Sequence, residues 1–164
     1  MENQIQKLNN QLAQMSAPVA FSHALMQCLI KLETPDKTEA KMELISLTSE
    51  LMPAGVPSFL EIVKYPMIRD LIAEIGKKKM LAILVLLVKD FCSSINVIRN
   101  MNEDQMIEAG AMLLDECVNF RLEDYVMMFS LAKRGQLIKI LDRIDLQLIG
   151  EMMDKYWEKS RQGR

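Results

Sequence analysis

A run of nine apolar residues, MLAILVLLV at positions 80–88, lies between three lysines at 77–79 and Lys89. A helix that crosses a bilayer needs about 20 apolar residues. Because this run is too short to span a membrane, we interpret it as the central buried helix of a soluble domain, with a segment at a membrane surface as the alternative. The sequence therefore predicts no membrane partner.

The residue balance around this run favours helices throughout. Leu and Met together account for 36 residues and Val and Thr for 11, and the chain contains 6 Gly and 5 Pro. Unbranched side chains lose little rotamer freedom in a helix, whereas β-branched side chains suit strands. Half of the 164 residues are hydrophobic, which is enough to form a core at this length. The sequence thus predicts an all-α fold, a compact multi-helix bundle.

One stretch divides the predicted bundle. Pro53, Gly55 and Pro57 follow one another closely, and a helix cannot continue through them. We expect a loop at this point, between a helical hairpin at residues 18–52 and a helical domain at residues 53–164.

The N-terminal segment, residues 1–17, has the pattern of an amphipathic helical arm. Its apolar side chains, spaced three, four and three residues apart, are Ile5, Leu8, Leu12 and Met15. This spacing is typical of a coiled-coil seam, although it covers only about two heptads. The arm is predicted either to lie on its own domain or to associate with a second copy and form a homo-oligomer.

Local signals also mark helix ends in the second domain. Asn102 and Gln105 have the spacing of a capping pair at a helix start. Gly110 falls in the middle of that helix, where glycine is unfavourable, and so predicts a close helix crossing. Acidic residues at 123–124 favour the start of the following helix, and Gly135 favours its end.

Residues that commonly carry catalysis or bind metals are scarce. His23 is the single histidine, and the chain contains no Cys-x-x-Cys pair and no glycine-rich phosphate loop. We therefore expect no enzymatic activity, no metal or other cofactor, and no small-molecule substrate. Cys28, Cys92 and Cys117 fall in apolar helical contexts, and we interpret them as buried free thiols of a cytoplasmic protein.

Four cations surround Gly135: Lys133, Arg134, Lys139 and Arg143. A net charge of −2 and a pI near 5.5 exclude a general attraction to nucleic acid, so any DNA contact must be a local patch. These four residues are the candidate contact surface for DNA or a protein partner. The alternative is that they are solvated charges favoured by helix ends.

The segment after Gly135 keeps helical spacing and predicts one helix or two over residues 136–159. Its apolar positions are Leu137, Leu141, Ile144, Leu148 and Met152. On such a helix Lys139 and Arg143 share one face, and Asp142 and Asp145 also share one. Because this aspartate pair lacks further ligands for a metal ion, we interpret it as charges that pair with cations or begin a helix.

Residues 100–157 carry several short motifs in a characteristic order. They are LED at 122–124, AK-G at 132–135, DRID at 142–145 and KY at 155–156. This order resembles a family of small helical proteins encoded by Bacteroides-type bacteria, their phages and mobile elements. The resemblance implies a role in phage DNA replication, as a replisome organiser or helicase-loader-like factor in the bacterial cytoplasm.

Together these features predict a non-enzymatic accessory protein of phage or mobile-element DNA replication that binds DNA or a replicative helicase. The alternative is a structural or virion-associated helical protein that acts only through protein–protein contacts. The high methionine content, 14 residues, suits adaptable protein surfaces but equally suits a core.

Overall fold

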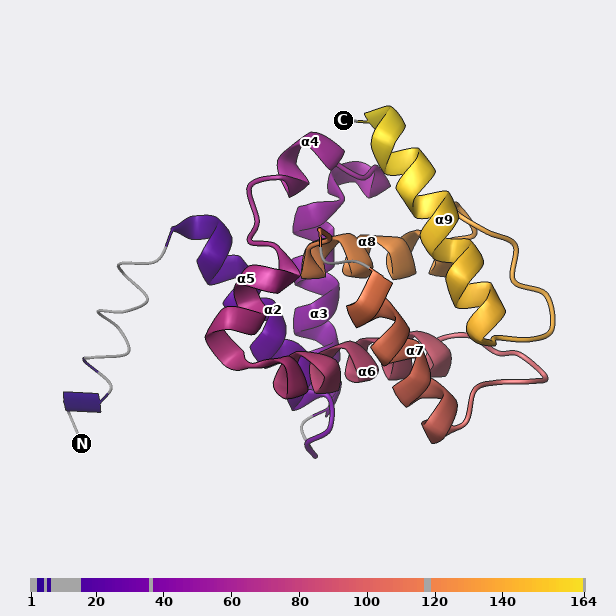
Figure 1. Ribbon diagram of the computed structural model, residues 1–164, viewed down its shortest axis with the longest axis horizontal. Coiled ribbons are helices and arrows are strands. Elements are labelled where there is room, and N and C mark those ends of the chain that lie inside the picture. Colours follow the sequence, from indigo (N-terminus) through magenta and orange to yellow (C-terminus); the bar gives the residue numbers. More distant parts are fainter. Residues whose placement is uncertain (1–2, 5, 7–15, 36, 117–118, 164) are drawn as a thin grey trace.

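The structure is a computed structural model that describes residues 3–4, 6, 16–35, 37–116 and 119–163. Over these residues it contains eight α-helices and no strand, which confirms the predicted all-α fold (Figure 1). In chain order the elements are α2 (Ala17–Lys31), α3 (Lys37–Leu51), the short 3-10 turn η1 (Pro53–Gly55), α4 (Phe59–Ile62), α5 (Ile68–Ile75), α6 (Lys77–Ser93), α7 (Glu103–Glu116), α8 (Leu122–Lys133) and α9 (Leu146–Gly163).

The predicted arm residues Ile5, Leu8, Leu12 and Met15 lie outside the described residues, and so does Cys117. Cys28 and Cys92 are buried free thiols, as predicted. Within the described part of the chain, no helix combines the length and apolar character needed to cross a bilayer.

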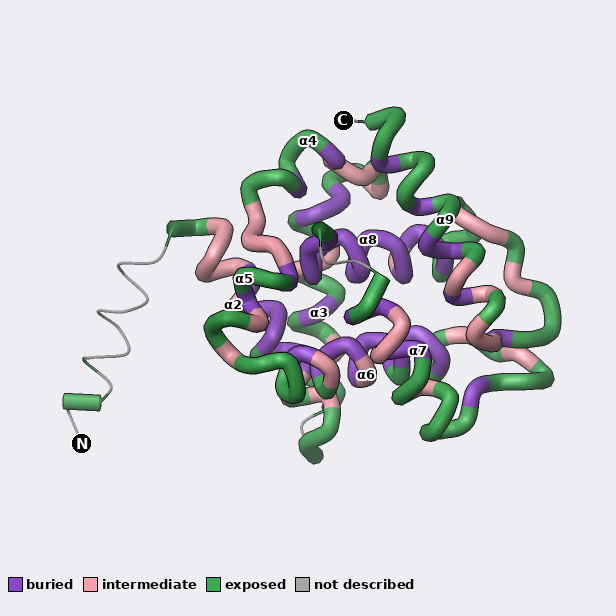
Figure 2. The backbone as a smooth tube through the Cα atoms, in the orientation of Figure 1, coloured by how far each residue is buried: buried purple, intermediate pink, exposed green. Residues whose placement is uncertain are grey.

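The helix α8 is the most enclosed element of the fold. It packs against α3, α6 and α9 and lies across the middle of the molecule in Figure 1. Of its 12 residues, all except Ser130 and Lys133 are buried, and Figure 2 shows it as an almost continuous purple tube. The run at residues 80–88 is part of a largely buried helix, α6, which packs against α2, α5, α7 and α8.

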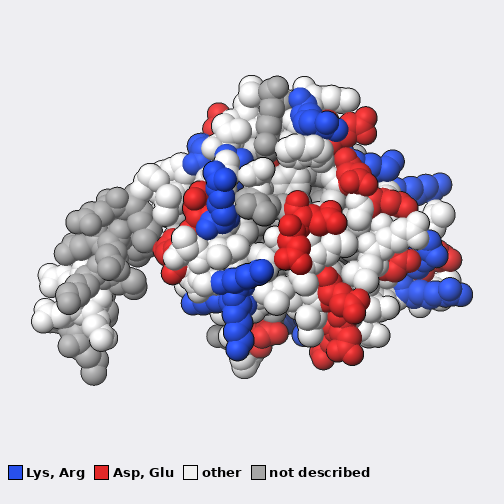
Figure 3. Space-filling view, viewed as in Figure 1, with Lys and Arg blue, Asp and Glu red and all other residues white. Residues whose placement is uncertain are grey.

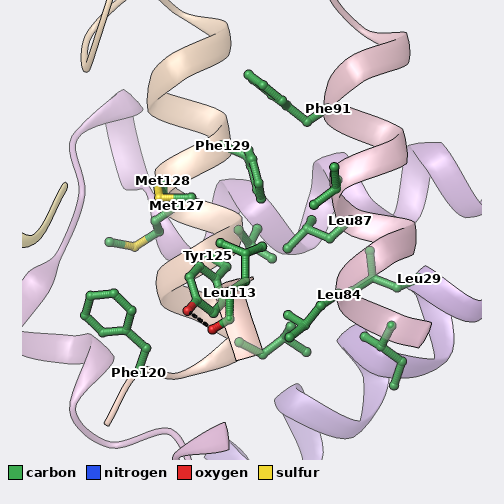
Figure 4. Packing of buried hydrophobic residues seen from close by; sticks show 14 of the residues in the cluster. Leu29, Leu84, Leu87, Phe91, Leu113, Phe120, Tyr125, Met127, Met128 and Phe129 are labelled. Carbon is green, nitrogen blue, oxygen red and sulfur yellow. Dashed lines mark hydrogen bonds between the residues drawn. The ribbon is translucent and has the colours of Figure 1, made fainter. Parts of the chain in front are cut away.

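Aromatic and aliphatic side chains surround α8 on several sides. Phe129 packs against Phe91 of α6 with 4.7 Å between ring centroids, and Tyr125 donates a hydrogen bond to the backbone carbonyl of Leu113 (Figure 4). One buried cluster includes Leu29 of α2 as well as Leu84 of α6. The predicted hairpin and the predicted second domain therefore contribute to the same core.

The predicted close crossing at Gly110 is confirmed. A Cβ atom at this position would lie 2.6 Å from Val85 Cγ2 and 3.2 Å from the Val85 backbone nitrogen. Only a residue without a side chain lets α7 approach α6 this closely. The predicted cap of α7 is also present, because the Asn102 and Gln105 side chains each accept the other's backbone N–H at 2.9 Å.

The helix predicted to follow Gly135 is absent between residues 136 and 145, and this prediction was wrong. Gly135, at φ 69°, ends α8 through hydrogen bonds from its own N–H to the Ala132 carbonyl and from the Gln136 N–H to the Leu131 carbonyl. The chain then runs extended, and α9 begins only at Leu146.

Long-range pairing explains the extended conformation. The Arg99 N–H donates to the Asp142 carbonyl at 3.0 Å, and the Ile144 N–H donates to the Arg99 carbonyl at 2.9 Å. β-branched isoleucines at 138, 140 and 144 suit this conformation. Leu137, Leu141 and Ile144 are spaced as a helical stripe, so the local pattern was ambiguous.

Candidate functional site

The four predicted contact cations fall into two pairs with different surroundings. Lys133 and Arg134 lie at the C-terminal end of α8, where they line a groove against α3. Lys139 and Arg143 lie on the extended segment after α8, and all four residues are exposed. Because residues 136–145 are not helical, Lys139 and Arg143 do not share a helix face.

The second pair belongs to a surface that we name the double loop, residues 95–100 and 136–145. Arg99 and Arg143 are bridge partners in this pairing, so the two arginines stand on neighbouring backbone segments. Ile98 is 88% exposed and Leu141 is 73% exposed beside them. Both loops project at the right-hand end of the molecule in Figure 1, where Figure 3 shows basic side chains interspersed with acidic ones.

The charges of the double loop are only partly neutralised. Arg143 Nε lies 3.2 Å from Asp145 Oδ2. Among the described residues, neither Arg99 nor Lys139 forms an ion pair. Because Arg99 and Arg143 are bridge partners on neighbouring backbone segments, a single anion could contact both residues.

Asp142 and Asp145 have separate structural positions. Asp145 Oδ1 accepts the Leu148 N–H at 2.9 Å and so caps α9, which agrees with the interpretation of a helix-start charge. Asp142 is exposed and contributes its backbone carbonyl to the double loop. Within the described part of the chain, no three His, Cys, Asp or Glu side chains are grouped so that they could hold a metal ion.

The first pair of cations lies in what we name the α3–α8 groove, which is lined by α3, α6 and the C-terminal end of α8. Lys133 Nζ lies 2.8 Å from Asp90 Oδ2, and Lys41 Nζ lies 3.5 Å from Asp90 Oδ1. The Asp90 carboxylate is almost fully buried, with 5% of its side chain exposed. Lys133 is therefore held by a structural partner, whereas Arg134 is exposed at the edge of the groove.

A second group of charges is buried at the start of α8. Asp124 Oδ1 accepts a hydrogen bond from the Tyr156 hydroxyl at 2.7 Å, and Asp124 Oδ2 accepts the Arg121 backbone N–H at 3.0 Å. The neighbouring Glu123 accepts a hydrogen bond from the Ser22 hydroxyl of α2. Both carboxylates are fully buried, so they connect α8 to α2 and α9 rather than to a ligand.

Burial raises the pKa of Glu123 to about 7, and the Ser22 hydrogen bond only partly opposes this rise. The nearby Arg121 guanidinium donates through Nε to the Tyr65 carbonyl and through Nη2 to the Val63 carbonyl. It therefore fixes the segment between α4 and α5. Burial also raises the pKa of the Cys28 and Cys92 thiols to about 11, which makes them poor nucleophiles.

Three residues of these surfaces were missed by the sequence-based prediction. The backbone bridge between Arg99 and Arg143 joins residues more than 40 positions apart. The ion pair between Lys41 and Asp90 also joins residues that are distant in the sequence. Local spacing gives no signal for either contact. Glu123 was predicted to favour the start of its helix, but its burial was not predicted, although the strongly apolar VMMF at 126–129 is a signal that this helix is enclosed.

Comparison of the chain with protein-family models, with curated proteins and with solved structures gives no match. The resemblance of residues 100–157 therefore rests on their motifs. In the structure LED begins α8, AK-G ends it, DRID leads into α9, and KY lies within α9.

Proposed function

We propose that the protein is a non-enzymatic accessory factor of phage or mobile-element DNA replication in the bacterial cytoplasm, and that it contacts DNA through the double loop. The opposed Arg99 and Arg143 are the observation that supports the DNA contact. Lys139 adds a third exposed cation from the same segment as Arg143. The motif resemblance supports the replication setting.

The distribution of charge restricts how DNA could approach. The exposed face of α7 carries five carboxylates and no basic residue, and it forms much of the red surface in Figure 3. Phosphates are repelled by this face and attracted by cations that have no internal partner. The double loop joins such cations to exposed Ile98 and Leu141, and aliphatic side chains of this kind often contact bases beside phosphate-binding residues.

Fluorescence anisotropy with a short labelled duplex and the matching single strand tests this proposal at low salt. We expect the variant Arg99→Ala/Lys139→Ala/Arg143→Ala to bind at least about tenfold more weakly than wild type, because its double loop no longer neutralises phosphates. The matched control removes three exposed lysines at the start of α6, as Lys77→Ala/Lys78→Ala/Lys79→Ala. Equal reductions in affinity for the two variants would reject the double loop as the contact surface.

A protein that acts only through protein contacts is the second candidate. Met42 and Ile45 favour it, because both are exposed apolar side chains on α3, at 67% and 60% of their surface. If wild type binds neither DNA probe at low salt, the DNA proposal fails and this candidate replaces it.

A further inference from the structure

We propose that the α3–α8 groove binds a short acidic segment of a partner protein, in which one aliphatic side chain is flanked by carboxylates. This inference goes beyond the DNA contact, because it concerns another surface and another class of partner. It rests on the shape of the groove, its apolar floor and the excess of cations around it.

The floor of the groove is apolar and its volume is small. Leu44, Leu87 and Phe129 are buried residues that line it, and Ile45 stands at its edge with 60% of its surface exposed. The cavity volume is about 130 Å³. Pockets for drug-sized ligands start at about 300 Å³, whereas a cavity of about 150 Å³ holds a group the size of benzene. The groove thus suits one side chain rather than a cofactor.

The charges around the groove favour an acidic partner. Among the described residues, its lining includes the cations Lys41, Lys133 and Arg134 and a single carboxylate, Asp90, which leaves a net charge of +2. Lys41 and Lys133 both lie against Asp90, so the partner carboxylates are expected chiefly at Arg134.

The Arg134 guanidinium lies beside a glycine of η1. A Cβ atom at Gly55 would lie 2.9 Å from Arg134 Nη1, so the bare backbone at Gly55 leaves room for the guanidinium. Guanidinium groups bind carboxylates in a bidentate geometry, which gives direction as well as affinity. A free phosphate would gain nothing from the apolar floor, and this favours a peptide that supplies both an aliphatic group and carboxylates.

Methyl NMR of the full chain, labelled at isoleucine and methionine, can test the proposal. The probe is a synthetic capped peptide with one leucine between two pairs of acidic residues. We expect it to shift the Ile45 methyl resonance in a saturable way. Two comparison peptides should shift it at least about fivefold less at the same concentration: one with alanine in place of leucine, and one with lysines in place of the acidic residues.

Two charge-reversal variants test whether the acidic peptide binds at the α3–α8 groove. Arg134→Glu should weaken the fitted Kd for the acidic leucine peptide at least about fivefold, and Arg69→Glu, an exposed arginine of α5, should leave it unchanged. Unaltered methyl resonances of Ile149 and Met152, which are buried in α9 and do not line the groove, show in the absence of peptide that both variants are folded. The proposal is overturned if the acidic peptide causes no shift, if the lysine peptide acts equally well, if Arg134→Glu has no effect, or if duplex DNA binds this groove instead.

Discussion

The surroundings of α8 and the double loop use charged residues in opposite ways. Around α8, Asp124 accepts a hydrogen bond from Tyr156, and Asp90 forms ion pairs with two lysines. In the double loop, Arg99 and Arg143 are exposed on two backbone segments that hydrogen-bond to each other. Buried charges need partners within the fold, whereas exposed cations that form no ion pair, such as Arg99 and Lys139, are free to act on another molecule. Substitutions at α8 should therefore reduce stability, and substitutions in the double loop should reduce binding.

The largest expected effect is on packing around α8. Phe129→Ala removes a buried ring that packs against Phe91 and should lower the free energy of unfolding by about 4 kcal/mol. Leu141→Ala, in the double loop, should change it by less than about 0.5 kcal/mol because its side chain is exposed. Urea unfolding followed by circular dichroism measures both values. Similar decreases in the free energy of unfolding of the two variants would mean that α8 and the double loop contribute equally to stability.

The next effect concerns Glu123 and pH. Its pKa is about 7 in the fold against an ordinary value of 4.5, so its contribution to stability is complete below pH 4.5 and is lost as pH rises through 7. Such a shift corresponds to about 3 kcal/mol. Glu123→Gln should remove this decline and unfold at higher urea than wild type at pH 8. The exposed Glu108→Gln is the control. An identical pH dependence in wild type and Glu123→Gln would contradict the prediction.

A smaller effect on stability should distinguish the cations of the α3–α8 groove from those of the double loop. Lys133→Ala leaves the buried Asp90 carboxylate with Lys41 alone and should destabilise the protein by about 2 kcal/mol, less than for a fully buried pair because Lys133 is partly exposed. Lys139→Ala should leave stability within about 0.5 kcal/mol of wild type. Thermal unfolding of the two variants in parallel provides the measurement. A loss of stability in Lys139→Ala as large as that in Lys133→Ala would show that Lys139 is a structural residue as well.

The smallest effect is expected at the double loop itself. Arg99→Ala removes one of two arginines on bridged backbone segments, so it should lessen their mutual repulsion and raise stability slightly, by at most about 1 kcal/mol, while it weakens DNA binding. Unfolding at low and high salt distinguishes this from a packing effect, because salt screens the repulsion and should reduce the gain. A clear loss of stability would mean that Arg99 holds the two loops together.

Features encoded by neighbouring residues could be predicted from the sequence. The cap formed by Asn102 and Gln105 and the stop at Gly135 depend on residues close in sequence, and the crossing of α7 with α6 is signalled by one local residue, a glycine inside a helix. The buried character of residues 80–88 follows from their composition in the same way.

Features created by distant residues could not be predicted. Residues 136–145 fit a helical stripe, but their backbone pairs with Arg99 and is extended. Glu123 and Asp124 resemble ordinary first-turn charges until Ser22 and Tyr156 are placed beside them. The candidate contact surface changed for the same reason, because the fold separates the surroundings of Lys133 from those of Lys139 and adds Arg99 to the latter.

The salt dependence of DNA binding tests most directly whether the double loop binds phosphates. For duplex DNA the slope of log K against log salt falls in magnitude by about 0.9 for each phosphate that the protein no longer neutralises. Arg99→Ala/Lys139→Ala/Arg143→Ala should therefore have a slope smaller than that of wild type by about 2.7 if each residue holds one phosphate. An unchanged slope in this variant, with wild type binding DNA, would contradict the account.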